Sequence, residues 1–163
     1  MTTRQLIVQG GGGFLMEKSR ALDHYFLRAT GKSNPRVCFV GTASGDAESA
    51  RYKFYEAMAG LDCRATHLSL VQPPAADLAA FVLEQDAIYV GGGNTASLLA
   101  VWRAHGVDRA MARAHDDGVV LAGLSAGFAL WAYTLLLPSI ANSGWLSTAF
   151  IAEGVFGTPL LRP

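Results

Sequence analysis

The sequence predicts an α/β protein, a three-layer sandwich with a mostly parallel sheet between helices. Apolar runs of strand length alternate along the chain with segments whose apolar residues have helical spacing. The candidate strands are apolar throughout, which is typical of a parallel sheet buried on both faces. A glycine-rich turn directly follows several of them. Right-handed crossovers would wind such a sheet into a Rossmann-like or flavodoxin-like sandwich.

The first half of the chain alternates twice between strand and helix. Gln5–Val8 is β-rich and leads into four glycines, after which Leu15–Ala29 has the apolar spacing of an amphipathic helix. Val37–Val40 is a continuous apolar run of strand length. Ala47–Ala59 again predicts a helix, which Gly60 ends.

The second half continues the alternation. Two prolines open the next predicted helix, because proline is tolerated in a first turn. Asn94 is a good N-cap for the helix after it. In chain order, we expect a weak strand at Ala65–Leu70, a helix over Ala75–Glu84, a strand at Ala87–Val90, helices over Thr95–His105 and Val107–His115, and a strand at Val119–Leu124.

Composition excludes several classes of protein. The 163 residues are 51% hydrophobic and 16% charged, with 13 basic and 13 acidic side chains. Balanced charge without a basic run argues against a nucleic-acid binder. Cys38 and Cys63 make neither a disulfide framework nor a CxxC metal site, so we expect buried free thiols, no metal and a cytoplasmic protein.

Charge is absent from a long stretch near the C-terminus. Asp, Glu, Lys and Arg do not occur between Gly118 and Ala152. The 20 uncharged residues of Gly118–Leu137 have the length of a membrane span. Their glycines and serine, and the lack of flanking Lys or Arg, favour instead a buried strand that ends in a tight turn.

Ligands bind parallel sheets at the carboxyl ends of the strands, where this chain has its glycine loops. Gly10–Gly13 fails the nucleotide motifs, because leucine and methionine stand where glycine is needed and no Gly-Lys pair follows at the spacing of a P-loop. We expect an active-site floor or a tight turn there. Gly91–Gly93, before the N-cap Asn94, suits an oxyanion at a helix start, although a sharp turn explains it equally well.

Gly123–Gly127 is the sharpest local signal. It fits G-x-S-x-G between a predicted strand and a possible helix, which is the context of a nucleophile elbow. We therefore predict that Ser125 is a nucleophile. The backbone N–H of Ala126 and that of Gly92 or Gly93 would form the oxyanion hole.

A serine nucleophile needs a base, usually a histidine. The candidates are His24, His67, His105 and His115, and none follows Ser125 in the chain. His105 or His115 would serve only if folding brought its ring within hydrogen-bonding reach of the serine.

These motifs resemble a known family. Ile88–Thr95 with Leu98-Leu99, followed by Gly123–Gly127, resembles the peptidase E group, which includes dipeptidase E and its cyanophycinase relatives. Gly10–Phe14 and Thr42–Asp46 also look like this family, so the similarity runs from about residue 6 to residue 127.

The resemblance implies a class I glutamine-amidotransferase-like fold and a serine peptidase without a cofactor. The implied reaction is hydrolysis of small aspartyl peptides through an acyl-enzyme on Ser125. Gly92, Gly93 and Ala126 match the oxyanion-hole backbone, and we expect Gly11, Gly12 and Asn94 to line the substrate site. Neither nucleic acid nor a membrane is implied as a partner.

The sequence departs from the family after Gly127. The family's catalytic histidine follows the serine by several tens of residues, but here no histidine or aspartate follows, and Glu153 is the only acidic residue. We hypothesise that residues 1–127 are the N-terminal part of the domain and that 128–163 are an atypical apolar tail from a truncated or frameshifted reading frame. The sheet would then be incomplete, with Phe128–Leu137 as a possible covering helix. The alternative function is an inactive amidotransferase-like domain.

Overall fold

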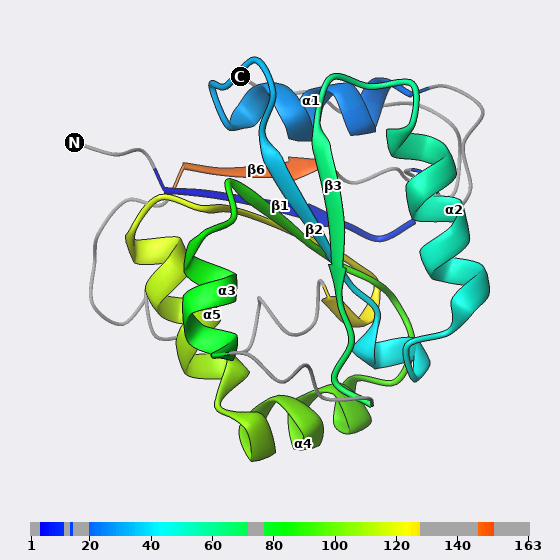
Figure 1. Ribbon diagram of the computed structural model, residues 1–163, viewed down its shortest axis with the longest axis vertical. Coiled ribbons are helices and arrows are strands. Elements are labelled where there is room, and N and C mark those ends of the chain that lie inside the picture. The colour runs from blue at the N-terminus through cyan, green and yellow to red at the C-terminus, as the bar shows by residue number, and fades with distance from the viewer. Residues whose placement is uncertain (1–3, 12–13, 15–19, 72–76, 128–146, 152–163) are drawn as a thin grey trace.

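The computed structural model describes residues 4–11, 14, 20–71, 77–127 and 147–151. Its centre is one six-stranded sheet with the order β3-β2-β4-β5-β1-β6, in which every pair of neighbours is parallel (Figure 1). The strands are β1 (Gln5–Gln9), β2 (Arg36–Val40), β3 (Arg64–Leu68), β4 (Ala87–Val90), β5 (Val120–Leu124) and β6 (Ser147–Ile151). The predicted parallel α/β sheet is therefore confirmed.

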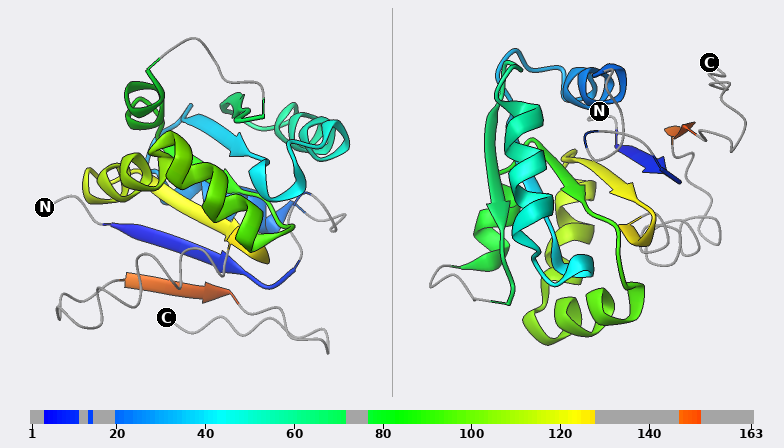
Figure 2. Two further views of the ribbon diagram at one scale, coloured as in Figure 1. Left: turned by 90° about the horizontal axis from the view of Figure 1, so that it is seen from below. Right: turned by 90° about the vertical axis from the view of Figure 1, so that its right-hand side faces the viewer.

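Helices pack on both faces of this sheet (Figure 2). They are α1 (Ala21–Ala29), α2 (Glu48–Met58), α3 (Leu78–Leu83), α4 (Thr95–His105) and α5 (Val107–Asp116), with a short 3-10 turn, η2, at Thr42–Ser44. Phe26 and Phe54 bring α1 and α2 onto one face. Val82, Trp102 and Met111 bring α3, α4 and α5 onto the other, which completes the three layers.

Most predicted elements lie within a residue or two of their observed bounds, and the exceptions have local causes. β3 ends at Leu68, because the Asp46 carboxylate accepts hydrogen bonds from the backbone N–H groups of Leu70 and Val71, at 2.8 and 3.0 Å.

The two prolines do not open α3, which begins at Leu78. Asp77 is its N-cap and accepts from the backbone N–H groups of the first turn, and residues 72–76 lie outside the described part. The same holds for residues 15–19, so α1 is described from Ala21 onward.

The C-terminal part contributes a strand that the sequence did not predict. β6 pairs with β1 along its whole length, from Gln5 opposite Ser147 to Gln9 opposite Ile151. It forms the edge of the sheet beyond β1. The helix expected over Phe128–Leu137 lies outside the described residues.

The uncharged stretch begins inside the fold. Its first part is β5, all five residues of which are buried. Over the described residues, no helix has the length and apolar character that a membrane crossing requires.

Both cysteines are free thiols, as predicted, but only one is fully buried. Burial raises the pKa of the Cys38 thiol far above its ordinary value, which makes it a poor nucleophile. Cys63 is half-buried, because it lies just before β3, an edge strand whose residues are mostly only partly buried.

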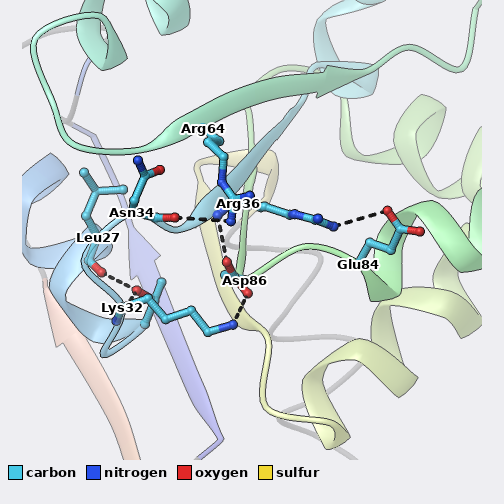
Figure 3. Close-up of polar contacts among 8 residues, drawn as sticks. Leu27, Lys32, Asn34, Arg36, Arg64, Glu84 and Asp86 are labelled. Atoms are coloured by element: carbon cyan, nitrogen blue, oxygen red, sulfur yellow. Dashed lines mark hydrogen bonds and ion pairs between the residues drawn. The ribbon is translucent and has the colours of Figure 1, made fainter.

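Asp86 joins β2 to β4 at the amino edge of the sheet (Figure 3). Its carboxylate accepts from Lys32 Nζ at 2.5 Å and from the backbone N–H of Arg36 at 2.8 Å. The Arg36 side chain continues to Glu84, with 3.3 Å between nitrogen and oxygen. Burial alone raises the pKa of Asp86, but the bonds from Lys32 and Arg36 outweigh it and hold the pKa below its ordinary value of 3.8.

We predict that Asp86→Asn lowers the free energy of unfolding at pH 7 by about 1 kcal/mol, since hydrogen bonds to a charged group contribute about 1.5–3 and exposed Lys32 is screened. A depressed folded-state pKa contributes stability that is present above about pH 4 and is lost as the pH falls through the folded pKa. Urea titrations at pH 7 and pH 3 should therefore show the difference from wild type shrinking. An equal difference at both pH values would contradict this account.

Candidate active site

Ser125 lies at the carboxyl edge of the sheet, directly after β5. β5 runs between β4 and β1, so the serine is flanked by the ends of both. Its backbone has a positive φ of 52°, unusual for a residue with a side chain, and its side chain is exposed. The backbone N–H donates to the carbonyl oxygen of Gln9 at 2.9 Å, which holds this conformation against its strain. The serine thus has the sharp strand-to-helix geometry of a nucleophile elbow.

Gly92 passes immediately beside this serine. A Cβ built on Gly92 would lie 3.2 Å from the Ser125 Cβ and 3.8 Å from its Oγ. Ala126 is buried and begins the helical turn after the serine. Main chain from β4 and β5 therefore meets at the serine, as the motif spacing indicated.

Gly93 is pressed against the loop that follows β2. Its φ is 146°, and a Cβ there would lie 2.0 Å from the carbonyl oxygen of Ala43. The same oxygen accepts from the backbone N–H of Asn94 at 2.7 Å. A side chain at this position would clash with the Ala43 carbonyl group, so only glycine fits.

Of the three residues predicted to line the substrate site, the structure describes Asn94 and Gly11. The Asn94 side chain accepts from the backbone N–H of Ser97 at 2.9 Å, so its oxygen caps α4 as predicted. Gly11 is half-exposed just beyond β1, and Gly12 lies outside the described residues.

No hydrogen bond joins any of the four histidines, all of which are described, to Ser125. His24 and His105 are exposed, and His105 ends α4, about 16 Å of helix away from the glycine turn. His115 lies in the last turn of α5 at the opposite edge of the sheet, with the whole of β5 between it and the serine. His67 lies on β3, with β2 and β4 between it and β5.

His67 is also engaged locally. Tyr55 Oη lies 2.8 Å from its Nδ1, and an Arg51 nitrogen lies 3.4 Å from its Nε2. Arginine only donates, so Nε2 is the acceptor in this contact and Nδ1 carries the proton. The condition for His105 or His115 to serve as the base, a ring within hydrogen-bonding reach of Ser125, is not met in the described geometry.

Sequence reasoning missed a buried polar pair beneath the site. The Tyr89 hydroxyl donates to Gln9 Oε1 at 2.6 Å, and both residues are 2% exposed. The sequence carries only a weak signal for this pair, which is a glutamine at the end of an apolar strand, immediately before glycines.

The sequence matches a peptidase family. The model of peptidase family S51 matches residues 6–144, most of the chain. The chain belongs to peptidase family S51. The resemblance to the peptidase E group is thereby confirmed.

Two curated relatives of this family member are similar over part of their length. The uncharacterized peptidase YgaJ of Bacillus subtilis (strain 168) is 49% identical over 129 residues, which are 78% of this chain and 56% of YgaJ. Peptidase E of Streptomyces coelicolor is 34% identical over 110 residues, 65% of this chain and 43% of that protein. The chain thus spans about half the length of these relatives.

A solved structure shares the fold of this S51 chain. It is a peptidase from an acI-B1 Actinobacterium, with a TM-score of 0.63 and 18% identity. The matched region covers 74% of this chain and 54% of the solved chain.

We predict that Gly93→Ala lowers the free energy of unfolding by about 3 kcal/mol or more. The added methyl group meets the Ala43 carbonyl, and the positive φ adds strain of about 1–3 kcal/mol. Gly10→Ala is the matched control, because a Cβ there meets nothing within 4 Å. Denaturant unfolding of both variants measures the difference, and equal losses would contradict the close approach.

We predict that His115→Leu raises the free energy of unfolding at pH 7 by about 1 kcal/mol, because His115 is buried and neither ring nitrogen has a hydrogen-bond partner among the described residues. Burial, then Arg4, lowers the pKa of His115 against a smaller opposing effect of Asp116. Wild type should therefore lose stability as the pH falls below about 6.5, and the variant should lose less. Unfolding between pH 7.5 and 5 tests this, with exposed His24→Gln as control.

Proposed function

We propose that the chain is a serine-type peptidase that hydrolyses small aspartyl peptides through an acyl-enzyme on Ser125. The observation that carries this proposal is the positive φ of Ser125 at the end of β5, beside the Gly92 backbone, in a chain of family S51. The substrate class rests on the resemblance to the peptidase E group. Two free cysteines support a cytoplasmic location as part of the proposal.

In this mechanism Ser125 Oγ attacks the scissile carbonyl carbon and gives up its proton. The carbonyl π electrons move to oxygen, and backbone N–H groups of Gly92 or Gly93 and of Ala126 stabilise the resulting negative charge. Collapse of the tetrahedral intermediate breaks the C–N bond and expels the amine, which takes up the proton given up by Ser125 through solvent water. A second water then attacks the ester, releases the carboxylic acid and returns a proton to Ser125 Oγ. Gly11, Gly12 and Asn94 would line the peptide-binding side of the same edge.

Turnover of peptides is slow in this proposal, because none of the four histidines hydrogen-bonds to Ser125. Triad members act as a unit, and removal of one costs orders of magnitude in rate. The same observation favours the second candidate, an inactive amidotransferase-like domain that keeps the pocket without the triad. The two differ in whether Ser125 is more reactive than an ordinary serine.

We predict that a fluorophosphonate probe labels wild type and that Ser125→Ala abolishes the labelling, because the elbow exposes Oγ beside backbone donors. The matched control is Ser49→Ala, which removes an exposed serine hydroxyl from α2. An aspartyl-anilide assay on the same variants measures turnover. Labelling and turnover that depend on Ser125 support the peptidase, whereas the absence of both in wild type supports the inactive domain.

A further inference from the structure

A buried amide lies beneath the serine elbow in an otherwise apolar layer. Gln9 is 2% exposed, at the end of β1, on the face of the sheet that carries the phenylalanines of α1 and α2. Its Oε1 accepts from the Tyr89 hydroxyl at 2.6 Å. A buried glutamine is costly unless its polar atoms are bonded, so this hydrogen bond is a specific feature of the position.

The Tyr89–Gln9 hydrogen bond crosses the strand that carries the serine. Tyr89 belongs to β4 and Gln9 to β1, and β5 lies between these two strands. In the register, Tyr89 is opposite Ala122 of β5, and Ala122 in turn is opposite Ile7 of β1. The small Ala122 side chain on the same face leaves room for the tyrosine to reach across.

Both residues of this hydrogen bond are connected to the surroundings of Ser125. The Gln9 carbonyl oxygen accepts the Ser125 N–H at 2.9 Å. Tyr89 lies three residues before Gly92, whose backbone passes beside the Ser125 Cβ. The bond therefore links the strand that holds the serine backbone to the strand that delivers the glycine turn.

The tyrosine is itself held in place by aromatic contacts. Its ring makes edge contacts with Phe14 at 4.9 Å and with Phe26 at 5.7 Å between centroids. The hydroxyl thus has one orientation available within the packed layer. Loss of the hydroxyl would leave the ring packing in place while removing the link to Gln9.

We propose that Gln9 is a positioning residue for Ser125, oriented by Tyr89, and that the Tyr89–Gln9 hydrogen bond fixes the spacing between the Gly92 backbone and the serine. This rests on the proposed function of the elbow. Small displacements of reacting groups have large effects on rate, about 100-fold for 1 Å. A hydrogen bond that sets this spacing is therefore expected to influence reactivity more than it influences the fold.

The test compares Tyr89→Phe and Gln9→Met with Gln85→Met. Gln85 is a matched control, because it is a second buried glutamine with one side-chain hydrogen bond, 2.9 Å from its Nε2 to the Phe81 carbonyl, at the opposite edge of the sheet. Two quantities are measured on the full chain: hydrogen exchange of the Ser125 backbone amide by NMR, and fluorophosphonate labelling as a function of probe concentration.

We expect Tyr89→Phe and Gln9→Met to speed exchange of the Ser125 amide on the order of tenfold and to lower the maximal labelling rate by a similar factor. The half-saturating probe concentration should stay unchanged. Gln85→Met should show neither effect, whatever its measured change in the free energy of unfolding, because it removes a buried amide far from Ser125. A split of this kind separates positioning from a general loss of stability.

Unchanged Ser125 amide exchange in Tyr89→Phe would overturn the positioning role, as would equal effects in Gln85→Met. Failure of wild type to react with the probe would overturn the proposed function instead. In that case amide exchange still decides whether Gln9 positions the elbow, because it does not depend on reactivity.

Discussion

The structure depends on backbone packed directly against backbone at the carboxyl edge of the sheet. A Cβ on Gly93 would lie 2.0 Å from the Ala43 carbonyl oxygen, and one on Gly127 would lie 2.5 Å from that of Val90. These distances admit only glycine, so the turns after β4 and β5 can come together without intervening side chains. In the proposed site the donors would be main-chain N–H groups, whose positions are set by the sheet and do not depend on side-chain rotamers.

Side-chain hydrogen bonds hold the loop after β2 in place at this edge of the sheet. The Asp46 carboxylate, itself on a residue of positive φ, accepts from the Ser69 hydroxyl and from two N–H groups after β3. It thereby anchors the loop that presents Ala43 to Gly93. On the other side, Trp102 of α4 donates to Thr42 in the same loop at 3.3 Å. The loop that carries Ala43 is thus held by hydrogen bonds from the residues after β3 and from α4.

The fold and the sharp turn at Ser125 could be predicted from the sequence because both have local sequence patterns. Apolar runs and helical spacing identified five strands and five helices, and α4 lies where Thr95–His105 was predicted. The Tyr89–Gln9 pair was out of reach, because its partners are 80 residues apart and neither has a local signature. β6 was missed for a related reason. Ser147–Ile151 forms a strand by pairing with β1, which is distant from it in the sequence.

The same distinction separates the parts of the proposed acyl-transfer site. Oxyanion donors and an exposed serine follow from sheet geometry, whereas a base must be a side chain that reaches the serine. The four histidines of this chain do other things: two are exposed on helices, one pairs with Tyr55 and Arg51, and one is buried at the amino edge. Serine proteases that have lost a triad member retain about 10³–10⁴-fold catalysis over water from the oxyanion hole and binding. An amine is a poor leaving group unless it is protonated, so loss of the base slows peptide cleavage more than attack on reagents whose leaving group departs as a stable anion. Reactivity of the serine and cleavage of peptides are therefore separate properties of this fold.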